Sequence, residues 1–222
     1  MKGWYQGQFK RFCDIASDAV TKEYPNSIYE ERLKKFIDDN LYEHLSELAK
    51  PKSHFAVIGH GDTWAPNFMF AYNGDSKSDI KGIQMIDFQL SRYGSPILDL
   101  SFFIFSCTSQ ELRLAHFKEL IKIYHSSLSE LLQELGSSPD DVFSYEAFEK
   151  EMLTYMQFGL GFSFESVPFS LMDESEASDL DLIEGDEAVP IEKVWNVAPL
   201  KNKEGRLRVA NNIKFAVDNS YL

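Results

Sequence analysis

Apolar residues recur every three or four positions along the first part of the chain, which predicts two amphipathic helices. Pro25 ends the first helix, Asn26 or Ser27 can cap the second, and Pro51 ends the second. The repeating positions are Phe9, Phe12, Cys13, Ala16 and Val20 in the first helix, then Tyr29, Leu33, Phe36, Ile37, Leu41, Leu45 and Leu48 in the second. We therefore expect residues 1–50 to form two helices.

The pattern changes at Phe55, where short apolar runs replace the helical spacing. Runs of strand type cover residues 55–58, 68–72 and 83–86. The stretch between the last two runs reads NGDSKSD and is rich in turn-forming residues, which predicts a hairpin connection. A small β unit over residues 55–88 is therefore expected between flanking helices.

Helical spacing returns after Pro96. A long apolar stripe from Phe117 to Leu135 stops at Gly136, a residue type that commonly ends helices. Further helices are expected from Tyr145 to about Phe158 and in the basic C-terminal stretch, residues 201–214, which we expect at the surface. Helices on both sides of a small β unit predict an α+β fold that is mostly helical.

The chain is acidic but rich in apolar residues. It has 222 residues, of which 44% are hydrophobic, and its formal net charge is -13. This composition excludes global disorder and predicts no binding to nucleic acid or to an anionic membrane. A nucleotide ligand remains compatible, because a metal ion can neutralise phosphate charge locally. Residues 173–187 hold eight Asp or Glu and no basic residue, which indicates a solvated acidic loop, with a partner-binding tail as the alternative.

The sequence contains no signal for secretion or membrane insertion. The N-terminus reads MKGWYQG and lacks the apolar core of a signal peptide, and the longest apolar stretch, around Phe102 to Phe105, is too short to span a bilayer. The two cysteines, Cys13 and Cys107, exclude a disulfide framework and a Cys-rich zinc site. We therefore expect a cytoplasmic protein with no membrane partner.

One loop and one strand end carry a set of oxygen-bearing side chains. The loop HGDTWAPN, residues 60–67, follows the first predicted strand and leads into the second, and the third strand ends in Asp87. The two hairpin strands bring Asn67 and Asp87 close together, with Asp62 on the loop before them. Two carboxylates and an amide oxygen suit Mg²⁺, which prefers a few protein oxygens together with phosphate and water.

The spacing also resembles the protein-kinase catalytic loop, in which the base and the metal-binding Asn are five residues apart and an Asp-Phe-Gly follows on the next hairpin. Here HGD and DFQ stand in place of HRD and DFG, which points towards small-molecule phosphotransferases of the same fold. HGDTWAPNFMF followed by IDFQLSRYGSPILDLSFF resembles the ecdysteroid kinase-like family of the choline-kinase-like superfamily, with aminoglycoside phosphotransferases as more distant relatives. The close match covers about residues 55–106.

The resemblance implies a fold and a set of roles. Residues 1–222 would form a protein-kinase-like C-terminal lobe, in which 55–88 carry the catalytic loop and the metal-binding hairpin and 97–222 form a helical acceptor-side subdomain. ATP and Mg²⁺ would be the cofactors. Asp62 aligns with the base that accepts the substrate hydroxyl proton, and the metal ligands align with Asn67 and Asp87.

Four further residues have implied roles. His60 and Asp99 would support the loop, His60 through hydrogen bonds and Asp99 as a buried acid. Met69 and Ile86 would lie beneath the adenine ring, although both would be core residues in any fold. Arg92 has two readings, contact with phosphate or pairing with a structural acid, and Trp64 could stack on a substrate or pack beneath the loop.

The same family carries a β-rich N-terminal lobe with a glycine-rich loop and a strand lysine. Only 59 residues precede His60, and they read as helices, so we expect that the N-terminal β lobe is missing and would be the natural intramolecular partner. The leading function is phosphorylation of a hydroxyl on a small-molecule acceptor, with an ecdysteroid-like sterol favoured. The alternative is a truncated, non-catalytic kinase-like lobe or gene-model fragment. The aromatic residues that could line an acceptor pocket, or be core, are Tyr155, Phe158, Phe162, Phe164 and Trp195.

Overall fold

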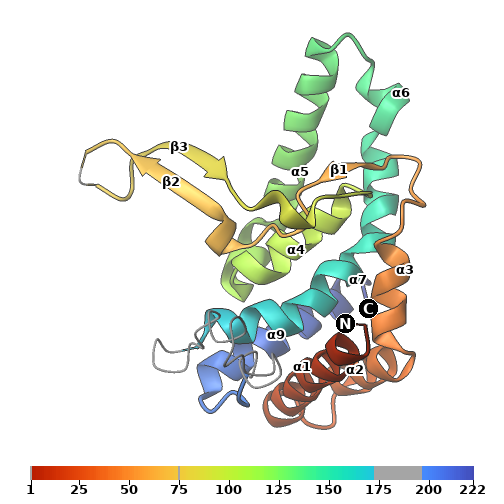
Figure 1. Cartoon of the computed structure of the whole chain (residues 1–222), viewed down its shortest axis with the longest axis vertical. Helices are drawn as coiled ribbons and strands as arrows, with labels where there is room; N and C mark the ends of the chain where they lie inside the picture. Colours follow the sequence, from red (N-terminus) through yellow and green to blue (C-terminus); the bar gives the residue numbers. More distant parts are fainter. Residues whose placement is uncertain (1, 75, 173–196) are drawn as a thin grey trace, which may run out of the picture. The chain divides into compact units, whose positions relative to one another are not determined.

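The computed structural model describes residues 2–74, 76–172 and 197–222 (Figure 1). The chain divides into two compact units, whereas the sequence analysis treated it as one lobe. The terminal unit comprises residues 1–44, 161–220 and 222, and the central unit comprises residues 45–160 and 221. The acidic stretch 173–187 and Trp195 lie outside the described residues, so the expectations for them stay predictions.

The terminal unit is built on helix α1, Lys2–Glu23, which packs against α2, Ile28–Asp38, and against α9, Lys203–Asp218. Arg206 of α9 donates to a carboxylate oxygen of Glu23 at 2.7 Å, which joins the ends of α1 and α9. The expectation of a C-terminal surface helix was wrong, because α9 is part of the core. Its buried residues are Gly205, Val209, Ala210, Asn212, Ile213, Phe215 and Ala216.

The single helix expected over residues 29–48 is two helices, α2 and α3, Leu41–Leu48. The chain breaks at Asn40, whose φ of 62° lies in the left-handed region that interrupts an α-helix. The predicted cap at the start of α2 is confirmed, since the Ser27 side chain accepts a hydrogen bond from the amide of Glu30. Hydrophobic spacing did not reveal this break, because the apolar residues continue at helical spacing from Tyr29 to Leu48.

Two small antiparallel sheets make up the β part of the central unit. Strand β2, Phe68–Tyr72, pairs with β3, Ile80–Met85, and this confirms the predicted hairpin. Strand β1, Val57–Gly59, pairs with β4, Arg92–Gly94, a strand that the sequence analysis missed because three residues show no alternation. The short 3₁₀ helices η1, Ala65–Asn67, and η2, Phe88–Leu90, lead into β2 and out of β3.

The helices of the central unit follow the sheets. They are α4, Ile97–Cys107, α5, Gln110–Glu134, α6, Pro139–Phe143, and residues 145–160 of α7, Tyr145–Ser170, a helix that is longer than predicted. Most of α4 is buried, and Gly136, with a φ of 82°, follows the end of α5 as predicted. The described chain is thus α+β and mostly helical. None of its described helices has the length and apolar character needed to cross a membrane.

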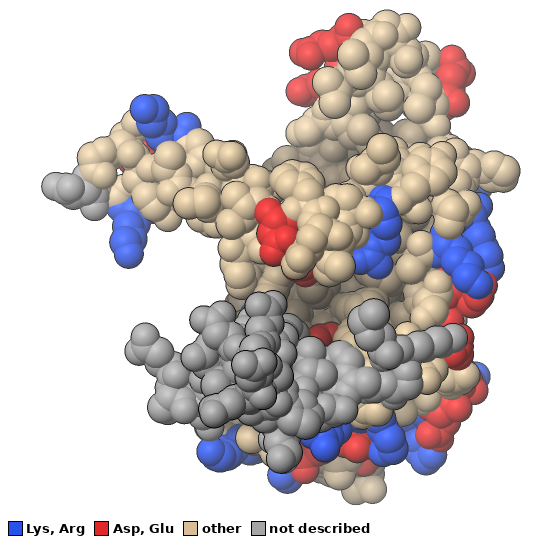
Figure 2. All heavy atoms as spheres, in the orientation of Figure 1, with Lys and Arg blue, Asp and Glu red and all other residues tan. Residues whose placement is uncertain are grey.

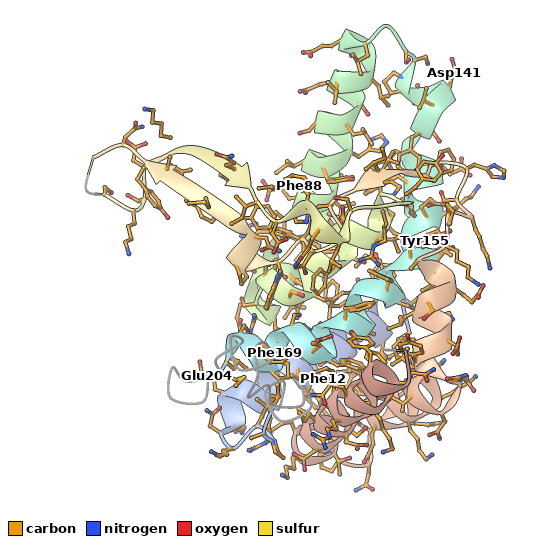
Figure 3. The ribbon with its side chains drawn as sticks, viewed as in Figure 1. Phe12, Phe88, Asp141, Tyr155, Phe169 and Glu204 are labelled. Carbon is orange, nitrogen blue, oxygen red and sulfur yellow. The ribbon has the colours of Figure 1, made fainter. Side chains whose placement is uncertain are left out.

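Helix α4 lies against α7 at Gly159. The Gly159 amide donates to Ser101 Oγ at 3.0 Å, and a Cβ placed on Gly159 would overlap the Ser101 backbone. Tyr155, labelled in Figure 3, lies one helical turn before this contact and is also buried. Glycine at this position therefore lets the two backbones approach closely, which fixes α4 within the central unit.

We predict that Gly159→Ala destabilises the protein by about 1–3 kcal/mol, because the added methyl group forces α4 and α7 apart. Chemical denaturation followed by circular dichroism measures the loss. Gly82→Ala is the matched control, since a Cβ at Gly82 meets nothing within 4 Å and its effect should stay within about 0.5 kcal/mol. Equal stability of Gly159→Ala and the wild type would contradict this packing.

Candidate active site

The loop after β1 is held by one carboxylate. Asp99, in the first turn of α4, accepts the backbone N–H of His60 at 2.6 Å on Oδ2 and that of Gly61 at 2.9 Å on Oδ1. Thr63 Oγ1 donates to the Asp99 carbonyl at 2.7 Å. The structure thus places Asp99 where a loop-supporting residue would lie. The residue is half-buried, which corrects the expectation of a buried acid.

His60 ties the same loop to the end of β3. Its Nδ1 accepts the Asp62 backbone N–H at 3.2 Å, which leaves Nε2 as the protonated nitrogen that donates to the Ile86 carbonyl at 2.8 Å. The ring is buried and lies 4.5 Å, centroid to centroid, from the ring of Phe88. Both ring nitrogens are therefore engaged with the backbone, a geometry suited to support and not to proton transfer.

The structure brings Asp62, Asn67 and Asp87 together. Asn67 is buried, and its Nδ2 donates to the Asp62 carbonyl at 2.9 Å and to Asp62 Oδ2 at 2.8 Å. The Asn67 carbonyl accepts the Ile86 N–H at 3.0 Å, so Asp87 follows directly beside it. Asp87 has a left-handed φ of 64°, a conformation that Asp tolerates better than most residues, and this turns the chain from β3 into η2.

These residues form a donor set compatible with Mg²⁺. Both Nδ2 bonds of Asn67 go to Asp62, so the amide presents its oxygen Oδ1 as the remaining ligand atom. Asp87 is exposed and Asp62 is half-buried. Within the described ranges no group of three or more His, Cys, Asp or Glu side chains could hold a metal ion. A site here would depend on two carboxylates, one amide and the oxygens of phosphate and water.

Burial raises the pKa of Asp62 above the ordinary aspartate value of 3.8. Hydrogen bonds from the side chains of Asn67 and Trp64 and the nearby His60 oppose this rise, whereas the charge of Asp87 adds to it. The dominant cause is desolvation of the carboxylate. A raised pKa makes this carboxylate a better proton acceptor than an ordinary aspartate.

The backbones of Asn67 and Ile86 meet at the base of the β2–β3 hairpin, where the Ile86 N–H donates to the Asn67 carbonyl. Asn67 belongs to η1 and Ile86 follows β3, whereas Met69 lies inside the ladder and pairs with Gln84. Met69 is 59% and Ile86 36% exposed, so the expectation that both would be core residues in any fold was wrong. Two apolar side chains close to Asn67 along the chain or by backbone pairing are therefore accessible.

More apolar side chains are exposed around this site. Figure 2 shows the hairpin surface as mostly uncharged, with lysine side chains near its turn, and Figure 3 labels Phe88 at the start of η2. The exposed apolar residues of β1, η2 and β4 are Val57, Ile58, Phe88, Leu90 and Tyr93. Exposed apolar side chains of this kind can form a site for a ligand or for another protein surface.

The structure gives Arg92 a contact that sequence reasoning missed. Its Nη2 donates to the Gly61 carbonyl at 2.8 Å and its Nε to the Leu90 carbonyl at 3.3 Å. The sequence could not predict either contact, because every residue has a backbone carbonyl and its residue type does not show which carbonyl will accept. Of the aromatic residues considered for an acceptor pocket, Tyr155, Phe158 and Phe164 are buried core residues.

Comparison with known families adds one finding. The model of the family described as "Ecdysteroid kinase-like family" matches residues 1–137, a range that contains the loop, the hairpin and Asp99. Neither the comparison with curated proteins nor that with solved structures found a match.

The raised pKa of Asp62 leads to a pH-dependent prediction. The folded state favours the protonated carboxyl, so the stability that this residue contributes is present below pH 3.8 and is lost as the pH rises through the raised value. Asp62→Asn cannot ionise, so at pH 7 it should melt at a higher temperature than the wild type. The difference should shrink as the pH falls towards 3.8.

Calorimetric melting in metal-free buffer measures this difference, because a bound cation would stabilise the wild-type carboxylate. Asp79→Asn, at an exposed position in the connection between β2 and β3, is the control and should show no such pH-dependent gain. A lower melting temperature for Asp62→Asn than for the wild type at neutral pH would contradict the prediction.

Proposed function

This chain belongs to the ecdysteroid kinase-like family, and on that basis we propose that it is an ATP- and Mg²⁺-dependent phosphotransferase acting on a hydroxyl of a small molecule. Membership in a family of kinase-like proteins indicates phosphoryl transfer. The observation that carries the proposal is the convergence of Asp62, Asn67 and Asp87 at the junction of loop and hairpin.

Asp62, Asn67 and Asp87 have separate proposed roles in phosphoryl transfer. Asn67 and Asp87 would hold Mg²⁺, which would supply the positive charge needed to offset repulsion between the phosphates and the two carboxylates. Asp62 accepts the proton of the acceptor hydroxyl as that oxygen bonds to the γ-phosphorus and the bond to the leaving diphosphate breaks. The Asn67 amide donates to Asp62 Oδ2 and the Trp64 side chain also hydrogen-bonds this carboxylate, so both residues would orient the proposed base.

The exposed apolar surface is the proposed floor for the adenine ring. Ile86 is hydrogen-bonded to the Asn67 backbone, Met69 is two residues beyond Asn67, and both side chains are exposed, so a nucleotide whose phosphates reach Asn67 could place its base over them. Described residues ahead of Val57 form helices only, so a strand lysine and a glycine-rich phosphate loop are not among them. We propose that a β-rich lobe covers this face when ATP is bound, as an intramolecular or a separate partner.

A neutral sterol of the ecdysteroid type is the favoured acceptor. Its support is the name of the family and the net charge of -13, which disfavours an anionic acceptor. We place the reaction in the cytoplasm, and we propose no nucleic-acid or membrane partner. The competing hypothesis, a non-catalytic kinase-like lobe, predicts no metal-dependent nucleotide binding, so calorimetry separates the two.

Asp87→Ala should weaken Mg²⁺-dependent ATP binding at least tenfold, or about 1.4 kcal/mol, because it removes a carboxylate that would hold the ion. Isothermal titration of the chain with ATP, with and without Mg²⁺, measures the affinity. Asp79→Ala on the same hairpin is the matched control and should bind as the wild type does. Absence of heat from the wild type at millimolar Mg·ATP would refute binding by this chain, and unaltered binding by Asp87→Ala would refute the ligand role.

Asp62→Asn should lower the rate of γ-phosphoryl transfer to an ecdysteroid by about 10²–10⁴, the usual contribution of a positioned base. Its affinity for Mg·ATP should change little, because Asp62 acts on the acceptor and not on the metal. Transfer is measured with radiolabelled ATP and affinity by titration. Parallel losses of rate and nucleotide affinity would contradict the assignment of Asp62 as the base.

A further inference from the structure

The peptide between Gly61 and Asp62 is held at both of its polar atoms. Its carbonyl accepts Nη2–H of Arg92 at 2.8 Å, and its N–H donates to Nδ1 of His60 at 3.2 Å. The preceding peptide is held by Asp99, which accepts the Gly61 N–H at 2.9 Å. Arg92 is thus the charged donor on the carbonyl directly before the proposed base.

Arg92 is itself anchored away from the loop. It lies in β4, where its backbone pairs with Gly59 of β1. Gly59 comes two residues before Gly61, whose carbonyl the Arg92 side chain binds. Its guanidinium carbon lies 5.6 Å from the centroid of the Phe158 ring, and Phe158 is a buried residue of α7. The head group is therefore oriented by the helical core of the central unit.

The contact requires a guanidinium and a glycine. Nε donates to the Leu90 carbonyl at 3.3 Å while Nη2 reaches Gly61, so one rigid fork joins two loops, which a lysine ammonium cannot reproduce. Gly61 has a φ of +85°, and a Cβ there would overlap the Leu90 carbonyl and lie 3.2 Å from Nε. Only a residue without a side chain lets the loop approach this fork.

We infer that Arg92 is a positioning residue, which orients the Asp62 carboxylate by fixing the plane of the Gly61–Asp62 peptide. Asn67 holds Asp62 from the other side, at its carbonyl and at Oδ2. Rotation of the peptide held by Arg92 would swing the Asp62 side chain away from the direction that Asn67 favours. The catalytic part of this inference rests on the proposed function, whereas the physical restraint does not.

Amide hydrogen exchange tests the restraint without any turnover. In Arg92→Met the Asp62 amide should exchange at least about tenfold faster by NMR, as expected when a hydrogen bond to a charged group is lost. Amides of α4 should keep their wild-type rates. In Arg92→Ala, millimolar guanidinium chloride should slow the Asp62 amide again, a rescue that a general packing role would not give. Lys118→Met, at an exposed position of α5, is the control and should leave the loop unchanged.

Phosphoryl transfer then tests the catalytic part. Arg92→Met should lower kcat by more than tenfold and leave the KM for ATP within about threefold, and Arg92→Lys should restore only part of kcat. Wild-type exchange at Asp62 in Arg92→Met, or faster exchange spread equally over α4, would overturn the restraint. Altered exchange with unaltered kcat would overturn its catalytic part. Absence of transfer by the wild type would instead refute the proposed function and leave the exchange result to decide the restraint.

Discussion

The Asp99 carboxylate on the amides of His60 and Gly61 is the interaction on which the site depends. Both bonds are charge-assisted, and they are made by a residue in the first turn of a helix that is otherwise mostly buried. That helix is fixed in turn by the close approach of Ser101 and Gly159. Asp99 thereby connects the loop after β1 to a close contact between two helices, and this allows the loop to hold a defined geometry.

Several features of Asp62 and Asp87 reduce the stability of the fold locally. Asp62 is a carboxylate whose burial raises its pKa, Asp87 lies nearby with the same sign of charge, and the backbone of Asp87 is left-handed. None of these features favours folding of the isolated chain. On the proposed function, each would be reduced or used when a cation and a phosphate occupy the site, and features of this kind often gather at functional positions.

The β2–β3 hairpin contributes little to the core. All of β3 is exposed, and Figure 1 shows the hairpin extending away from the helices of the central unit. At its base the ring centroids of Phe68 and Phe103 lie 5.5 Å apart. A two-stranded hairpin of this kind is marginal in water by itself. Exposure of Met69 and Ile86 is therefore a property of the whole hairpin, and it is what makes these side chains available to a ligand.

Local chemistry along the sequence determined the elements that depend on near neighbours. Ser27 capped a helix, Gly136 ended one, and the polar run 73–79 closed a hairpin, because each effect acts over a few residues. The five-residue spacing of Asp62 and Asn67 likewise located the candidate site. Only the tertiary structure decided the rest. The pairing of β4 with β1, the burial of α9 and the contact of Arg92 with the Gly61 carbonyl depend on groups that are distant along the chain, and the sequence does not show which backbone carbonyl or helix face a residue will meet.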